Sequence, residues 1–97
     1  MTREEIVAIL KENYGIIESR FKVRSLALFG SAARGEAGAD SDVDVLVDFP
    51  EPPTFDQYME LKFFLEDVLH RGFDLVTRRG LRERFRTQVQ KDAISVP

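Results

Sequence analysis

The stretch LALFGSAARGEAGADSDVDVLVDF, residues 26–49, contains two apolar runs separated by a loop of small and charged residues. The first run ends at a glycine and the second is rich in valine, so each is typical of a buried strand. We predict strands at 23–29 and 42–49, with one helical turn at 31–34 between them. Side chains two residues apart on a strand point to the same face, so Asp42 and Asp44 should stand together.

The flanking segments predict helices on both sides of this pair of strands. Thr2 and Glu5 have the spacing of a capping box, which indicates a helix over 3–19. Gly15 lies inside this helix and favours an early end or a bend, since glycine is a weak helix former. A second helix is expected from Thr54 to about residue 70. Its inner stripe should be Tyr58, Leu61, Leu65 and Val68.

The last third of the chain predicts a third strand at 73–77 and a last helix at 81–92. His70 is the only histidine and should cap the preceding helix. The element order α-β-β-α-β-α predicts an α/β fold, with a small mixed sheet of three to four strands and helices packed on it. We expect one domain over residues 1–97.

The composition excludes several classes of function. With 14 basic and 17 acidic residues the net charge is −3, so no global positive field attracts nucleic acid. A locally basic segment at 78–91 is expected to be a solvated helix face. The chain has no cysteine, which excludes disulfides and thiolate chemistry. No apolar run is long enough to span a membrane, so we expect a soluble, cytoplasmic protein.

The two aspartates at the start of the second strand indicate a metal site. Carboxylates held close together repel each other, and a divalent cation relieves that repulsion. Mg²⁺ prefers oxygen ligands and is commonly held by one or two carboxylates plus substrate phosphates. Asp-x-Asp alone is more typical of solvated residues at a strand end. The turn at Gly30 and Ser31 can bind phosphate, and the Arg34 guanidinium suits the same ligand. The combination predicts a nucleoside triphosphate site.

Asp74 is a charged residue in a stretch otherwise suited to burial. If the third strand lies beside the second, this carboxylate joins the aspartate pair. It could then help to hold the metal and accept the proton of an attacking hydroxyl, as a general base. An exposed strand edge is the alternative explanation.

Residues 29–49, FGSAARGEAGADSDVDVLVDF, resemble the signature of the polymerase β-like minimal nucleotidyltransferases, the antitoxin partners of HEPN-domain ribonucleases. The resemblance continues through DLVT at 74–77 and covers nearly the whole chain. It implies metal-binding and catalytic roles for Asp42, Asp44 and Asp74, and nucleotide-binding roles for Gly30, Ser31, Arg34 and Ser41. The implied cofactor is Mg²⁺, as one or two ions, and the implied substrate is ATP.

The same resemblance implies a reaction and a partner. AMP would pass from ATP to a tyrosine hydroxyl of a HEPN ribonuclease toxin, which is silenced by the modification. Phe63 and Phe64 are apolar residues beyond those the sheet needs and could dock this partner, although a thick core helix is the more ordinary explanation. Two alternatives stay open: a non-catalytic antitoxin that acts by occlusion, and transfer to a small molecule such as an antibiotic. A homo-oligomer is also left open.

Overall fold

A computed structural model of the chain describes residues 2–35, 42–81 and 83–96. Four strands form one mixed sheet in the order β3-β2-β1-β4, with β2 parallel to β3 and antiparallel to β1, and β1 antiparallel to β4. The elements along the chain are α1 (Arg3–Phe21), β1 (Ser25–Phe29), α2 (Gly30–Ala33), β2 (Val43–Asp48), α3 (Phe55–Leu69), β3 (Phe73–Thr77), α4 (Glu83–Asp92) and β4 (Ile94–Val96). This arrangement confirms the expected small α/β fold.

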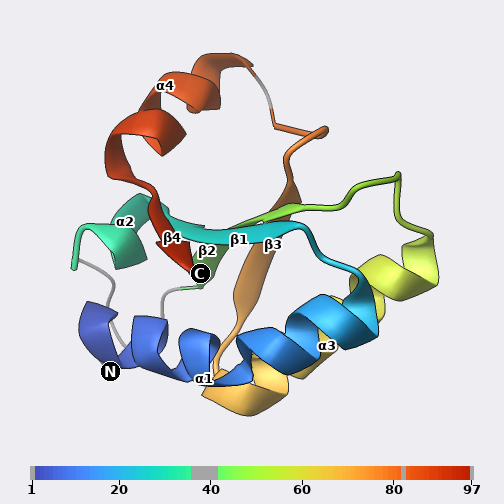
Figure 1. Cartoon of the computed structure of the whole chain (residues 1–97). Coiled ribbons are helices and arrows are strands. Elements are labelled where there is room, and N and C mark those ends of the chain that lie inside the picture. The colour runs from blue at the N-terminus through green and yellow to red at the C-terminus, as the bar shows by residue number, and fades with distance from the viewer. Residues whose placement is uncertain (1, 36–41, 82, 97) are drawn as a thin grey trace.

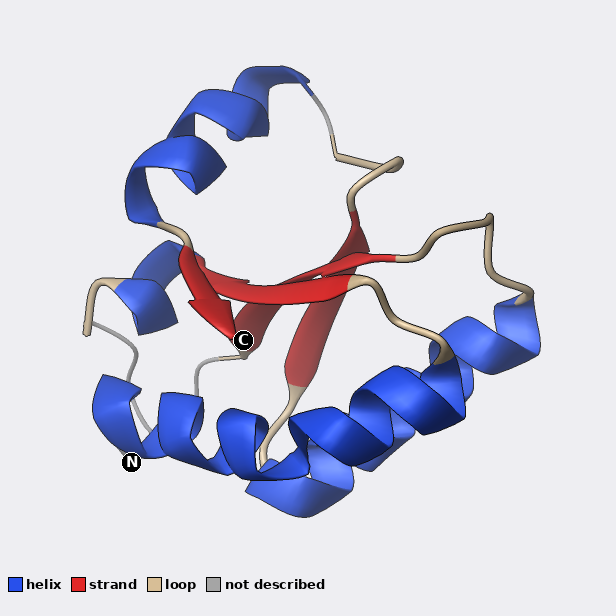
Figure 2. Cartoon of the chain, in the orientation of Figure 1, coloured by secondary structure: helices blue, strands red, loops and turns tan. Residues whose placement is uncertain are grey.

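The sheet separates two layers of helices (Figures 1 and 2). Helices α1 and α3 lie together on one face, while the short α2 and the later α4 lie toward the other. On β2, Val43, Val45 and Val47 are fully buried beneath α1 and α3. The alternation of a strand turns Asp44 to the opposite face. The first face therefore holds the core, and the second carries the polar side chains.

Helix α1 begins as the sequence predicts. The Thr2 hydroxyl accepts a hydrogen bond from the Glu5 backbone N–H at 3.1 Å, and the Glu5 carboxylate accepts one from the Thr2 N–H at 3.0 Å. The expectation of an early end or bend at Gly15 is wrong, because the helix continues to Phe21. Burial of Ile17 and Phe21 anchors its last turns against the core and outweighs the weak propensity of one glycine.

Helix α3 begins after Thr54, whose hydroxyl accepts a hydrogen bond from the Gln57 backbone N–H. His70 ends it in the left-handed conformation, with φ 55°, in the capping position that the sequence predicts. The expected inner stripe needs one correction, because Leu69 is buried in place of Val68. The C-terminal turn thus presents its larger side chain to the core.

The additional phenylalanine side chains on α3 differ in their burial. The Phe64 ring packs on Phe21, with 5.4 Å between ring centroids, and belongs to the edge of the core. Phe55 and Phe63 are exposed, at 75% and 58% of their surface. The prediction that Phe63 docks a partner remains a prediction.

The last strand is absent from the predicted element order. β4 pairs with β1 over only three residues, from Leu26↔Val96 to Leu28↔Ile94, and such a short segment carries little periodicity. The first strand is also shorter than expected, beginning at Ser25. Within the described ranges, no helix combines the length and the apolar character needed to cross a membrane.

Candidate active site

The junction between β1 and α2 brings the backbone against an acidic side chain. Gly30 has φ +70°, which is the left-handed region that glycine enters without strain. A β-carbon at this position would overlap the Asp44 Oδ2 atom and crowd the rest of that side chain. Only glycine therefore allows both the turn and the close approach of Asp44.

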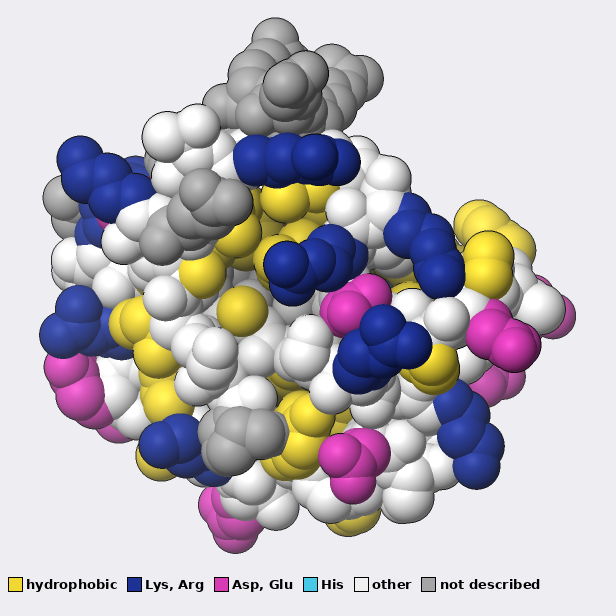
Figure 3. Space-filling model, turned by 45° about the horizontal axis from the view of Figure 1, so that its top comes forward, with side chains coloured by type: hydrophobic (Ala, Val, Ile, Leu, Met, Phe, Trp, Pro, Cys, Tyr) yellow, Lys and Arg dark blue, Asp and Glu magenta, His cyan; other side chains and the backbone are white. Residues whose placement is uncertain are grey.

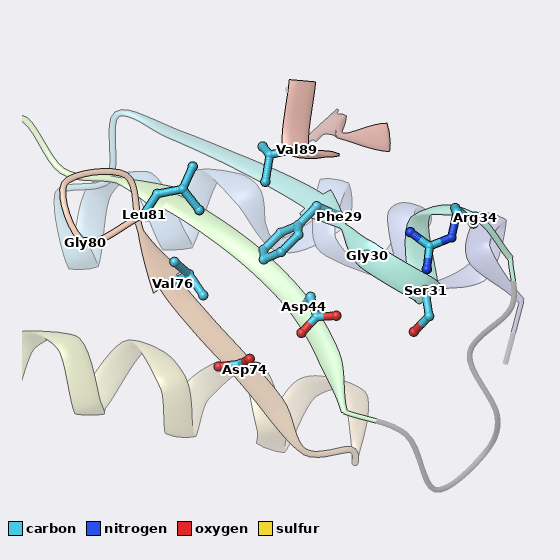
Figure 4. Close-up of a pocket in the computed structure, with 10 residues that line it drawn as sticks. All are labelled: Phe29, Gly30, Ser31, Arg34, Asp44, Asp74, Val76, Gly80, Leu81 and Val89. Carbon is cyan, nitrogen blue, oxygen red and sulfur yellow. The ribbon is translucent and has the colours of Figure 1, made fainter. Parts of the chain in front are cut away.

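Asp44 and Asp74 form the centre of the site. They are direct partners in the parallel register of β2 and β3, so their side chains leave the sheet on the same face. The two carboxyl groups are within hydrogen-bonding reach of each other. Figure 4 shows both at the middle of one pocket. The condition on which the role of Asp74 depends, that the third strand lies beside the second, is met.

Burial raises the pKa of Asp44 to about 6, and the neighbouring negative charge and hydrogen bond of Asp74 add to this effect. The Asp42 charge raises this pKa further, whereas the Arg34 guanidinium lowers it. An acid with a raised pKa in a pocket is typical of functional sites. Burial is the largest cause of the raised pKa, and a bound cation would relieve the repulsion between carboxylates that adds to it.

Asp42 is the residue immediately before β2, and its side chain is exposed. Its carboxylate lies against Gly72, where a β-carbon would overlap the Asp42 Oδ1 atom. The Val43 N–H donates to the Gly72 carbonyl at 3.0 Å and ties the two segments together. Asp42 is absent from the lining of the pocket that contains Asp44 and Asp74.

The pocket has a volume of about 660 Å³. Gly30, Ser31 and Arg34 line one end of it, at the junction of β1 and α2 (Figure 4). Apolar side chains from β1, β3 and α4, with the turn after β3, line much of the remainder: Phe29, Val76, Leu81 and Val89. The pocket thus combines a polar end, a central acidic pair and an apolar wall.

Arg34 also links two elements that are distant in the sequence. Its Nη1 atom lies 3.0 Å from the Asp92 Oδ2 atom, at the end of α4. This ion pair is partly shielded from water, with 16% of the Asp92 side chain and 35% of the Arg34 side chain exposed. The pair holds the guanidinium at the rim of the pocket and fastens α4 beside α2.

The structure thus brings together five of the predicted site residues: Gly30, Ser31, Arg34, Asp44 and Asp74. Asp42 lies at the side of this group, and Ser41 falls outside the described residues. Sequence reasoning missed Asp92 and the apolar wall. It also missed the close contact between Gly72 and the Asp42 carboxylate, which joins two segments distant in the sequence.

The donor set has the chemistry that Mg²⁺ requires, because carboxylate oxygens are its preferred protein ligands. Among residues 2–35, 42–81 and 83–96, no group of three or more His, Cys, Asp or Glu side chains is arranged to hold a metal ion. Asp44 and Asp74 would nevertheless hold such an ion, with substrate phosphate and water as further oxygen ligands. The residues present fit the metal in type and charge.

Comparison with known proteins identifies the family. The profile of the family described as nucleotidyltransferase domain matches residues 4–96. The chain belongs to this family and is a nucleotidyltransferase, which confirms the resemblance expected from residues 29–49.

Three similar proteins illustrate this relationship. Protein adenylyltransferase MntA of Thermococcus cleftensis is 41% identical over 96 residues, covering 99% of this chain and 97% of the relative. A solved structure, provisionally named a minimal nucleotidyltransferase, superposes with a TM-score of 0.81 at 40% identity, covering 97% of this chain and 95% of that one. A chain in the complex of tri-AMPylated Shewanella oneidensis HEPN toxin with MNT antitoxin has a TM-score of 0.64 at 25% identity, covering 91% of this chain and 70% of that one.

Proposed function

We propose that this protein is a metal-dependent protein adenylyltransferase that transfers AMP from ATP to a tyrosine hydroxyl of a partner HEPN ribonuclease, and thereby acts as its antitoxin. The observation that carries the proposal is the Asp44 and Asp74 pair, which shares a pocket with Gly30 and Ser31. The names of the adenylyltransferase relative and of the toxin complex support the choice of AMP and of a HEPN partner.

Each residue has a role in this proposal. Gly30 and Ser31 contact the triphosphate, because the bare Cα lets phosphate approach the backbone and the hydroxyl can donate a hydrogen bond. Arg34 assists at the same end. Ser41, which lies outside the described residues, is proposed to bind the nucleotide as well. Asp44 and Asp74 would hold Mg²⁺, and Asp42, which lies at the side of this pair, would join them when the ion binds. When bound, this ion would neutralise charge on the phosphates and on the leaving pyrophosphate.

The reaction needs a proton acceptor beside the incoming hydroxyl. Asp74 takes this proton as a general base, the hydroxyl oxygen bonds to the α-phosphorus, and the bond from that phosphorus to pyrophosphate breaks. The two tyrosines of this chain, Tyr14 and Tyr58, have structural roles in the fold. Their hydroxyls donate to the carbonyls of Arg24 and Leu75, respectively, and hold helices α1 and α3 in place.

A protection assay distinguishes catalysis from occlusion. The chain carrying both Asp42→Asn and Asp44→Asn should fail to protect cells that express the partner ribonuclease, at equal protein abundance. Asp48→Asn is a matched control, because Asp48 lies at the far end of the same strand and pairs with Arg24 at 3.9 Å. Full protection by the doubly substituted chain would contradict the proposal and favour inhibition by binding alone.

A further inference from the structure

The active-site pocket borders a second hollow of about 260 Å³. The two share Leu81 and Val89, and the second hollow extends over the sheet to Leu46, Arg78 and Arg86. Figure 3, which brings the α4 side of the molecule forward, shows apolar atoms in a depression flanked by Lys and Arg side chains. The site therefore has an open extension on one side.

This extension is apolar at its floor and positively charged at its rim. Leu46 and Val89 are each only 7% exposed, whereas Arg78 and Arg86 are exposed. Within the described part of the chain, no carboxylate lies within ion-pair distance of either guanidinium, and no acidic side chain lines the hollow. Although the protein has a net charge of −3, this hollow can bind a negatively charged group at its rim and an apolar group on its floor.

The position of the hollow relative to the carboxylates indicates which reactant it receives. The Gly30 and Ser31 end of the pocket lies on the β1 side of Asp44, and Asp74 lies on the β3 side. In an in-line displacement, the attacking oxygen arrives opposite the leaving group. If pyrophosphate leaves at the β1 side, the hydroxyl arrives at the β3 side. From Asp74, β3 continues through Val76 and is followed directly by Arg78 at the rim of the hollow.

We propose that the hollow formed by Leu46, Arg78, Leu81, Arg86 and Val89 binds an acidic segment of the partner protein that carries the acceptor hydroxyl. Apolar side chains of this segment contact the floor, and its carboxylates pair with Arg78 and Arg86. This inference rests on the proposed function, because it names the surface through which that function finds its acceptor. A nucleic acid is disfavoured, since none of the described residues that line the hollow has an aromatic ring for base stacking.

Binding measured without catalysis tests the surface directly. The partner ribonuclease is titrated against the Asp44→Asn chain, with and without the added charge reversals Arg78→Glu and Arg86→Glu. The reversals should weaken binding at least about 10-fold, and the loss should diminish as salt increases. Lys11→Glu with Lys91→Glu is the matched control, because both lysines are exposed and line neither hollow. The control pair should leave the affinity within about two-fold of the parent.

Three results would overturn the proposal. The first is an unchanged affinity for the partner when both arginines are reversed. The second is an equal loss of affinity for a fluorescent ATP analogue, which would assign the arginines to the nucleotide. The third is binding of a single-stranded RNA oligonucleotide that competes with the partner and is abolished by the reversals. Failure of AMP transfer by the wild-type chain would contradict the proposed function alone, since this binding assay requires no transfer.

Discussion

At the scale of single residues, Asp44 combines a structural cost with a proposed catalytic role. Its pKa is raised from 3.8 to about 6, so the folded protein binds this proton more tightly than the unfolded chain does. The contribution of Asp44 to stability is therefore fully present below about pH 4 and is lost as the pH rises through about 6. At neutral pH the ionised carboxylate is a source of local destabilisation.

Asp44→Asn should consequently stabilise the metal-free protein above pH 6 while abolishing AMP transfer. We expect a gain of about 1 kcal/mol at pH 7.5 after allowing for the solvent exposure of the site, and no gain at pH 4. Urea unfolding in the presence of a chelator measures both values. A variant less stable than wild type at pH 7.5 would show that burial and charge repulsion do not make the ionised Asp44 destabilising.

Gly30 provides a second prediction at this scale. Gly30→Ala forces a side chain into φ +70° and against Asp44, so it should destabilise the fold by about 2 kcal/mol or more and weaken triphosphate binding. Gly15→Ala is the matched control, because nothing lies within 4 Å of a β-carbon there and the residue is helical. It should stabilise the protein by about 0.5–1 kcal/mol. Thermal or urea unfolding of the two variants gives the comparison, and equal effects would contradict it.

At the scale of elements, the contact between Arg34 and Asp92 connects the loop after α2 to the end of α4. Because α4 supplies part of the apolar wall, this contact also influences the shape of the pocket. A double-mutant cycle with Arg34→Gln and Asp92→Asn should give a coupling energy of about 0.5–1 kcal/mol, as expected for a partly shielded pair. Additive effects on the free energy of unfolding would show that the pair contributes nothing.

The elements also show what the sequence can predict. Strands β2 and β3, and the two capped helices α1 and α3, follow from local patterns, and their positions agree with those patterns to within one or two residues. The pairing of Asp44 with Asp74 needed only the assumption that β3 adjoins β2. By contrast, Asp92 meets Arg34 across 58 residues of sequence, and β4 is recognisable only when its partner β1 is known. Such long-range contacts have no local pattern to predict them.

At the scale of the whole molecule, one face of the sheet packs the hydrophobic core and the other face forms the candidate active site. Valines of β2 fix the core beneath α1 and α3, and the intervening Asp44 faces the pocket beneath α4. Because successive side chains of a strand point to opposite faces, β2 contributes to the core with one face and to the proposed reaction centre with the other. The partner is expected to approach the α4 face, where the pocket opens, whereas the exposed Phe63 lies on α3.

Protein adenylylation is the central claim, and one measurement tests it most directly. The chain and the protein encoded beside it are purified together and incubated with Mg²⁺ and ATP, and intact masses are recorded for wild type and for the Asp42→Asn, Asp44→Asn variant. We predict that the partner gains the mass of one or more AMP groups only with wild-type chain and metal. A partner of unchanged mass that is still bound and inhibited would contradict the claim.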